Sequence, residues 1–206
     1  MVLEGIDGSG TTTQLPRLVA HLNSRGRRAL ATREPSTGPI GGLLRQILSG
    51  QHRGPDGAPV DGKAMALLFA GDRRDHLTRE IQPALAAGTD VVSDRYLLSS
   101  LAYQAEEAER DWVASLAREV RRPDLTLLLD VPVAVAAARR RAAGRPIERY
   151  DADAVQERVA ANYRRLAAAD PTGVVTVDGS RSVDDVTAAA VAAIDRLLAT
   201  NRGNDR

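Results

Sequence analysis

Residues 4–14 read Glu-Gly-Ile-Asp-Gly-Ser-Gly-Thr-Thr-Thr-Gln, close to the phosphate-binding pattern G-x-x-x-x-G-K-[ST]. Gly5, Gly10 and Thr12 hold fixed positions of that pattern, while Thr11 stands where it has lysine. Glycines let the backbone curl so that its N–H groups, with the N-terminus of the next helix, face a phosphate. The stretch therefore predicts a strand, a nucleotide-binding loop and a helix, with one positive charge missing. The alternative is a glycine-rich turn that binds no ligand. Phosphate contacts are expected from Gly5, Ile6, Asp7, Gly8, Ser9, Gly10, Thr11, Thr12 and Thr13.

Around this stretch, short apolar segments alternate with longer amphipathic ones, which indicates an α/β fold with a largely parallel sheet. Strands are expected at 1–3, 28–32, 89–93, 125–129 and 174–177. Helices are expected at 12–24, 40–48, 64–86 with a bend near Pro83, 97–104, 109–121, 133–142, 151–169 and 183–199. No repeat or linker divides the sequence, so we expect one domain over 1–206 with a frayed tail at 201–206.

The composition of the chain limits the kinds of partner and site that we expect. A net charge of +1 gives no general reason to expect nucleic acid or an anionic membrane surface as partner. The absence of cysteine excludes disulfides and thiolate metal sites and fits a reducing compartment. No apolar segment approaches the roughly 20 residues of a membrane helix, so we expect a cytoplasmic protein.

Polar residues follow the third expected strand, beginning with Asp94-Arg95-Tyr96. In open α/β sheets the carboxyl ends of the strands form the ligand crevice, so these residues are expected near the loop of residues 5–10. Arg95 could bind a phosphate with both guanidinium nitrogens, and its alternative is an ion pair with Asp94 or Glu34. Helical spacing then predicts one face, which could meet a sugar and base or be ordinary surface, from Ser99, Ser100, Tyr103 and Gln104.

Further candidate residues come from helical spacing, from the loop of residues 5–10 and the helix after it, and from the end of the third expected strand. Phe69 and Arg73 are four residues apart and could stack on a base and bond its carbonyl, although a phenylalanine among leucines is usually core. Thr12 is the hydroxyl expected to touch a magnesium ion, and Asp94 is the second candidate ligand. Asp7 is a further carboxylate near the phosphates, with capping of the turn as its alternative role.

Residues 139–151 contain the densest basic stretch, with three arginines at 139–141 and two more at Arg145 and Arg149. Glycine and proline interrupt this stretch between two expected helices, which suits a lid that closes over phosphates and excludes water. A solvated helix end is the alternative.

Taken together, these segments resemble the thymidylate kinase family along almost the whole chain. The resemblance rests on 3–10, 32–35, 68–73, 94–96 with 99–104, and 122–131, in that order. It implies a three-layer P-loop kinase fold with a five-stranded parallel sheet flanked by helices, ATP and Mg²⁺ as cofactors, phosphorylation of dTMP to dTDP, and a homodimer. It further implies that Phe69 stacks on thymine, Arg73 meets its O4, Ser100 lies near N3 and Tyr103 lies under the deoxyribose. Arg95 would hold the acceptor phosphate with Arg33 nearby, and Asp7, Arg95 and Arg145 would be the catalytic residues.

Thr11 departs from this family, whose members keep lysine there as a rule. One hypothesis is an active kinase in which lid arginines, foremost Arg145, replace the lysine. The others are a non-catalytic nucleotide-binding relic and a kinase for another pyrimidine nucleoside monophosphate.

Overall fold

The computed structural model describes residues 1–54, 56–144 and 146–204, with backbone alone at 201–204. Its centre is a five-stranded sheet in the order β2-β3-β1-β4-β5, and every neighbouring pair is parallel. The strands are β1 (Val2–Glu4), β2 (Ala29–Arg33), β3 (Asp90–Asp94), β4 (Thr126–Asp130) and β5 (Val174–Asp178). The predicted α/β class and the five-stranded parallel sheet are therefore confirmed.

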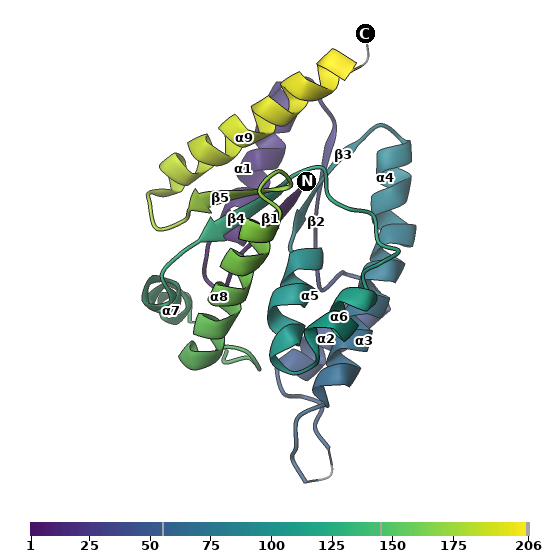
Figure 1. Ribbon diagram of the computed structural model, residues 1–206, viewed down its shortest axis with the longest axis vertical. Coiled ribbons are helices and arrows are strands. Elements are labelled where there is room, and N and C mark those ends of the chain that lie inside the picture. The colour runs from purple at the N-terminus through teal and green to yellow at the C-terminus, as the bar shows by residue number, and fades with distance from the viewer. Residues whose placement is uncertain (55, 145, 205–206) are drawn as a thin grey trace.

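Helices cover both faces of the sheet (Figure 1). They are α1 (Thr11–Ser24), α2 (Pro39–Leu48), α3 (Gly62–His76), α4 (Gln82–Ala86), α5 (Leu97–Tyr103), α6 (Arg110–Ser115), α7 (Val133–Ala142), α8 (Asp153–Ala169) and α9 (Val183–Asn204). A π-helix, η1 (Leu77–Ile81), joins α3 to α4, and a 3₁₀ turn, η2 (Gln104–Glu106), follows α5.

The alternation of side chains along the strands produces the three layers. Leu127 and Leu129 of β4 pack with α1 and α9 on one face, whereas Leu128 packs with α5 and α8 on the other. On that second face, Val91 of β3 packs against η1. The strands are thus buried on both sides, as parallel strands usually are.

Three helices differ from their predicted extent by more than two residues. The predicted bend near Pro83 occurs one turn earlier, at η1, because proline has no N–H and its ring collides with the carbonyl four residues before it. The predicted helix 109–121 ends at Ser115, whose hydroxyl donates to the Trp112 carbonyl and competes with the helical ladder there. In contrast, α9 continues beyond the predicted end at 199 to Asn204, and 205–206 lie outside the described residues. The predicted fraying of the tail at 201–206 stays a prediction.

The fold brings the carboxyl ends of β1, β3 and β4 to one edge of the sheet, where β1 leads into the glycine loop and α1. This is the edge at which parallel α/β sheets bind ligands. Within the described part of the chain, no helix is both long and apolar enough to cross a lipid bilayer.

Candidate active site

The loop between β1 and α1 needs its glycines for steric reasons. Gly5, Gly8 and Gly10 have φ angles of 154°, 89° and 106°. A Cβ atom on Gly5 would lie 2.6 Å from Ser9 Oγ, and one on Gly8 would lie 2.5 Å from the carbonyl oxygen of Ala136. The loop can therefore wrap tightly only with glycine at these positions, as a phosphate-binding backbone requires.

A cleft of about 630 Å³ opens over this loop and the first turn of α1. Thr11, Thr12 and Thr13 line it, while the side chain of Ile6 is buried in the core. Two carboxylates, Asp7 and Asp94, line the cleft together with five arginines, so the lining has a positive net charge without the lysine: Arg33, Arg95, Arg139, Arg140 and Arg181.

Thr12 and Asp94 meet in this cleft. The Thr12 hydroxyl donates to Asp94 Oδ2 at 2.7 Å. The other carboxylate oxygen, Oδ1, is buried and has no hydrogen-bond partner among the described residues. A hydroxyl beside an unpaired carboxylate oxygen fits Mg²⁺, which takes few protein ligands and keeps water and phosphate oxygens. No cluster of three or more acidic, histidine or cysteine side chains suited to a metal occurs in the described ranges.

Arg95 is the central cation of the site. Its backbone φ of 72° is unusual for a residue with a side chain. Its guanidinium donates to the Gly5 carbonyl at 2.9 Å and to Asp7 Oδ1 at 2.8 Å, so its ion pair is with Asp7 and not with Asp94 or Glu34. Burial alone would lower the pKa of Arg95, but the charges of Tyr103, Asp7 and other neighbours raise it well above its usual value. The group is therefore a permanent cation.

A second, smaller cavity of about 100 Å³ adjoins the cleft, and Asp7 and Arg95 line both. Four more of the predicted residues line this cavity, namely Phe69, Ser99, Tyr103 and Gln104. Sequence reasoning did not single out Pro35, Leu48, Glu148 and Tyr150 as further lining residues. Gln104 Oε1 is buried without a partner in the described part of the chain, so the cavity offers it to a ligand. The cavity therefore has an aromatic wall and an unused polar atom.

Arg73 and Ser100 lie behind this cavity and do not line it. Both are buried, and Arg73 Nη2 donates to Ser100 Oγ at 2.6 Å. Arg73 Nε donates to Glu34 at 3.0 Å, which fixes the guanidinium plane. Arg73 Nη2 also donates to the Tyr96 carbonyl at 3.2 Å, so three neighbours hold the guanidinium in place.

Glu4, at the end of β1, is a site residue that sequence reasoning missed. It is 0% exposed, and its Oε2 accepts from the Ser99 hydroxyl at 2.6 Å and the Tyr163 hydroxyl at 2.9 Å. Its Oε1 accepts from the backbone N–H groups of Tyr96 and Ser99. Burial raises the pKa of Glu4, although these hydrogen bonds and Arg95 oppose the rise. The sequence could have indicated Glu4, because it is an ionisable residue at the carboxyl end of a buried strand.

The predicted lid segment, 139–151, contacts the glycine loop at its first end and Glu107 at its other end. Arg139 donates to the carbonyls of Ser9 at 3.3 Å and Gly179 at 3.0 Å, and Arg140 donates to the Asp7 carbonyl at 2.6 Å. At the other end, Arg149 and Tyr150 both bind Glu107. Arg145, the arginine favoured by the sequence, lies outside the described residues.

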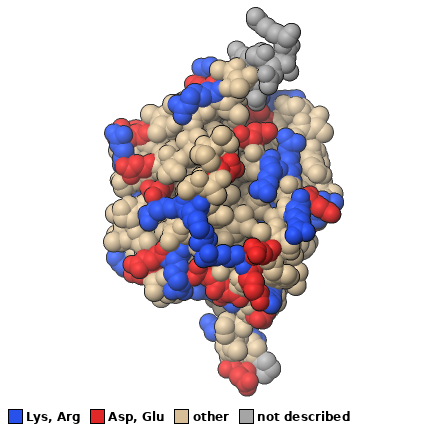
Figure 2. Space-filling view, viewed as in Figure 1, with Lys and Arg blue, Asp and Glu red and all other residues tan. Residues whose placement is uncertain are grey.

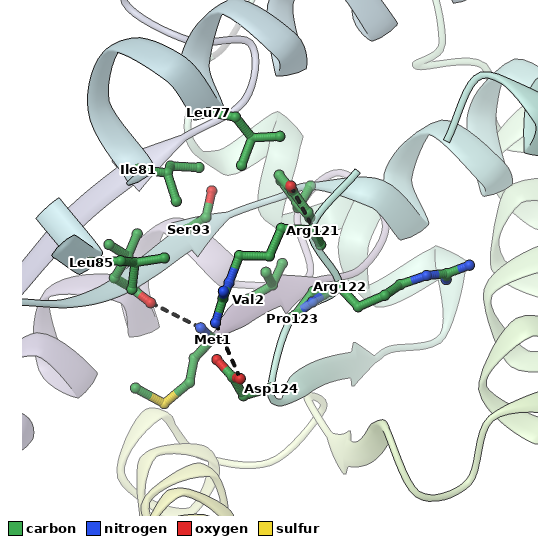
Figure 3. Close-up of a pocket in the computed structure, with 12 residues that line it drawn as sticks. Met1, Val2, Leu77, Ile81, Leu85, Ser93, Arg121, Arg122, Pro123 and Asp124 are labelled. Atoms are coloured by element: carbon green, nitrogen blue, oxygen red, sulfur yellow. Dashed lines mark hydrogen bonds and ion pairs between the residues drawn. The ribbon is translucent and has the colours of Figure 1, made fainter. Parts of the chain in front are cut away.

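Other surfaces are less suited to a nucleotide. A cavity of about 40 Å³ lies at the far ends of β1 and β3, and Figure 3 shows its apolar wall of Leu77, Ile81 and Leu85. It is too small for a nucleoside. On the face seen in Figure 2, basic and acidic side chains are interspersed and form no broad basic surface.

Comparison with known proteins gives a consistent result. The family profile described as "Thymidylate kinase" matches residues 3–190. A probable thymidylate kinase of Thermococcus kodakarensis is 39% identical over 201 residues, covering 96% of this chain and 98% of the relative. A thymidylate kinase of Bifidobacterium longum subsp. infantis is 41% identical, covering 96% of this chain and 86% of the relative. A probable thymidylate kinase of Pyrococcus horikoshii is 38% identical, covering 96% of both chains.

Proposed function

The chain belongs to the thymidylate kinase family, and from this premise we propose that it transfers the γ-phosphoryl group of ATP to dTMP and forms dTDP. One observation supports this most: the glycine-loop cleft and the smaller cavity are adjacent and share Asp7 and Arg95. Donor and acceptor phosphates bound in these two spaces would meet at Arg95. Such a reaction needs positioning and charge neutralisation more than covalent chemistry from the protein.

The smaller cavity is the proposed site of the acceptor nucleotide. The Phe69 ring is available to stack on the base, and Tyr103 lies under the sugar with its hydroxyl donating to Asp7 at 3.0 Å. Gln104 is the proposed partner of the base edge. Binding of the base O4 by Arg73, which Ser100 holds behind the cavity wall, stays a prediction from the sequence. Ser99 and Arg95 would face the acceptor phosphate, and Arg33 would approach it from the cleft.

The larger cleft is the proposed site of ATP. The loop N–H groups and the start of α1 would hold its phosphates, and the far end, lined by Val183, Val186 and Ala143, suits an apolar base. Thr12 and Asp94 would hold Mg²⁺, which supplies positive charge to the phosphate oxygens. The acceptor is an anionic phosphate oxygen, so this site requires no general base.

Thr11 removes the charge that a lysine would give to the terminal phosphates, and arginines would supply it instead. Arg139 and Arg140 are held against the loop carbonyls at the cleft. The proposed catalytic role of Arg145 stays a prediction. Thr11 is also the observation that favours the second candidate, a protein that binds both nucleotides without turnover.

A coupled assay of ATP consumption with dTMP, dUMP, CMP and AMP tests the proposal. Turnover fastest with dTMP is expected, and a preference for another monophosphate would instead identify a different kinase. Calorimetric binding of both nucleotides without product would support the non-catalytic candidate. Loss of activity with chelator and recovery with Mg²⁺ would test the role given to Thr12 and Asp94.

We also propose that the chain forms a homodimer through α2 and α3. Leu43 on α2 and Leu67 on α3 expose large apolar side chains. A second copy would cover them. The cytoplasmic location expected from the sequence stays a prediction.

A further inference from the structure

Helix α8 places one buried polar face toward the active site. Gln156, Val159 and Tyr163 are spaced three and four residues apart, so they share a face, and each is at most 1% exposed. A fully buried glutamine needs several partners, because an unsatisfied amide in the interior costs free energy. Those partners are residues of the site.

We propose that Gln156 is a positioning residue that holds the Asp7 carboxylate and couples it to the returning end of the lid segment. This inference rests on the proposed function. In this role Gln156 holds the residues of the acceptor cavity in place through Asp7, and it does not contact the reacting atoms.

The amide of Gln156 binds Asp7 at two points. Its Nε2 donates to Asp7 Oδ2 at 3.0 Å, and its Oε1 accepts from the Asp7 backbone N–H at 3.2 Å. The second Nε2 hydrogen points to the Tyr150 carbonyl at 2.9 Å. The opposite amide orientation would set oxygen against both acceptors and NH₂ against the N–H, so the network fixes this orientation.

Asp7 is the residue through which this contact can affect catalysis. Its Oδ1 binds Arg95, its Oδ2 also accepts from the Tyr103 hydroxyl, and it lines both cavities. Gln156 therefore holds a carboxylate that in turn orients the central cation and the tyrosine of the acceptor cavity. A small rotation of Asp7 would misplace both.

The lid segment is attached to the same carboxylate. Tyr150, held by Gln156, packs its ring edge-on against Tyr103 with 5.4 Å between centroids. At the other end of the segment, Arg140 donates to the Asp7 carbonyl and pairs with Asp151. The same contacts therefore hold both the end of the lid segment and the Asp7 carboxylate in place.

Steady-state kinetics of Gln156→Leu, with ATP and dTMP varied separately, test the inference. Leucine keeps most of the volume and removes all three hydrogen bonds. We expect kcat/KM for dTMP to fall about 10- to 100-fold while the Kd for ATP changes by less than about threefold. Asn162→Leu is the matched control, since Asn162 is a buried amide on the same helix that bonds Ala102 and Glu106 and lines neither cavity. Equal losses in the two variants, or an unchanged kcat/KM in Gln156→Leu, would overturn the inference.

Gln156→Glu adds a readout that a purely structural role would not affect. An ionised glutamate would repel Asp7, whereas a protonated one restores the donor. The ratio of Gln156→Glu to wild-type activity should therefore rise as the pH falls from 8 to 6. The ionisable groups around this position are Asp7, Arg95, Tyr103, Arg140, Tyr150 and Asp151. A flat ratio would contradict the proposed contact.

The activity of the wild-type protein with dTMP tests the proposed function separately from this inference. If wild type does not phosphorylate dTMP, the proposed function fails and calorimetric dTMP binding becomes the readout. Weaker dTMP binding by Gln156→Leu than by Asn162→Leu would then support the inference, and equal binding would reject it.

Discussion

Thr11 sets the chemistry of the loop at the scale of a single residue. It lines the cleft that five arginines also line, so the missing ammonium leaves a basic site. We expect Thr11→Lys to change kcat by less than about threefold, because the guanidinium groups of the cleft would already neutralise the phosphates. Arg145→Ala, in contrast, is expected to lower kcat about a hundredfold or more, or about 2.7 kcal/mol. Similar small effects of both substitutions in the dTMP kinase assay would contradict this division of roles.

Glu4 provides a pH-dependent prediction. Because burial raises its folded-state pKa above the usual 4.5, the folded protein binds this proton more tightly than the unfolded chain. The stability from this group is complete below about pH 4.5 and is lost as the pH rises through the folded pKa. Glu4→Gln should remove this contribution and leave a stability curve that falls less with rising pH. Urea unfolding from pH 5 to 8 measures both curves, and parallel curves would be inconsistent with the shift.

Single residues also show how far the sequence could lead. The loop pattern and strand ends identified Asp7, Arg95 and Tyr103, because those motifs are local. Glu34 as the partner of Arg73 could not be found this way, since 39 residues separate them and they meet only where α3 packs beside the end of β2. The spacing of Gln156 and Tyr163 on one helical face was readable, but such a face does not reveal which loop it contacts.

At the scale of elements, the lid segment is held by Glu107, just after η2. Glu107 accepts from Arg149 twice at 3.1 Å and from the Tyr150 hydroxyl at 2.9 Å. Glu107→Ala should free the lid end and raise KM for dTMP about 3- to 10-fold, because Tyr150 lines the acceptor cavity. Faster hydrogen exchange at 146–151 should accompany this change.

Glu119→Ala is the control for this substitution, since Glu119 is an exposed carboxylate outside both cavities. The same rise in KM in both variants, or unchanged exchange at 146–151 in Glu107→Ala, would count against a holding role for Glu107.

Element boundaries followed from sequence where local chemistry decides them. The helix over 133–142 was predicted at its observed limits, as the apolar spacing and the glycine at 144 suggested. The π-helix was not predicted, because its position depends on packing of Leu77 and Ile81 against β3 as well as on Pro83.

At the scale of the whole molecule, alternation of strands and helices predicted the parallel sheet, but not the order of its strands. That order depends on which strands pair across long separations, such as Leu3 of β1 with Asp94 of β3. It nevertheless decides the site, since β1 lies between β3 and β4 and so places the glycine loop beside Asp94 and Arg95. The order of the motifs along the chain, supported by the family relationship, predicts the site although alternation alone does not give the strand order.

The proposed homodimer gives the last prediction at this scale. Leu67 on α3 is 53% exposed and Leu43 on α2 is 39% exposed, on two helices that pack together around Leu44 and Met65. A partner copy would remove this apolar surface from water, whereas an arginine buried there would have no counter-charge. Sedimentation equilibrium should therefore show a dimer for wild type and a shift toward monomer of at least tenfold in Kd for Leu67→Arg. Ala188→Arg, on the exposed face of α9, should leave the dimer intact. A monomeric wild type, or a Leu67→Arg variant that dimerises as tightly as wild type, would show that α3 does not form the interface.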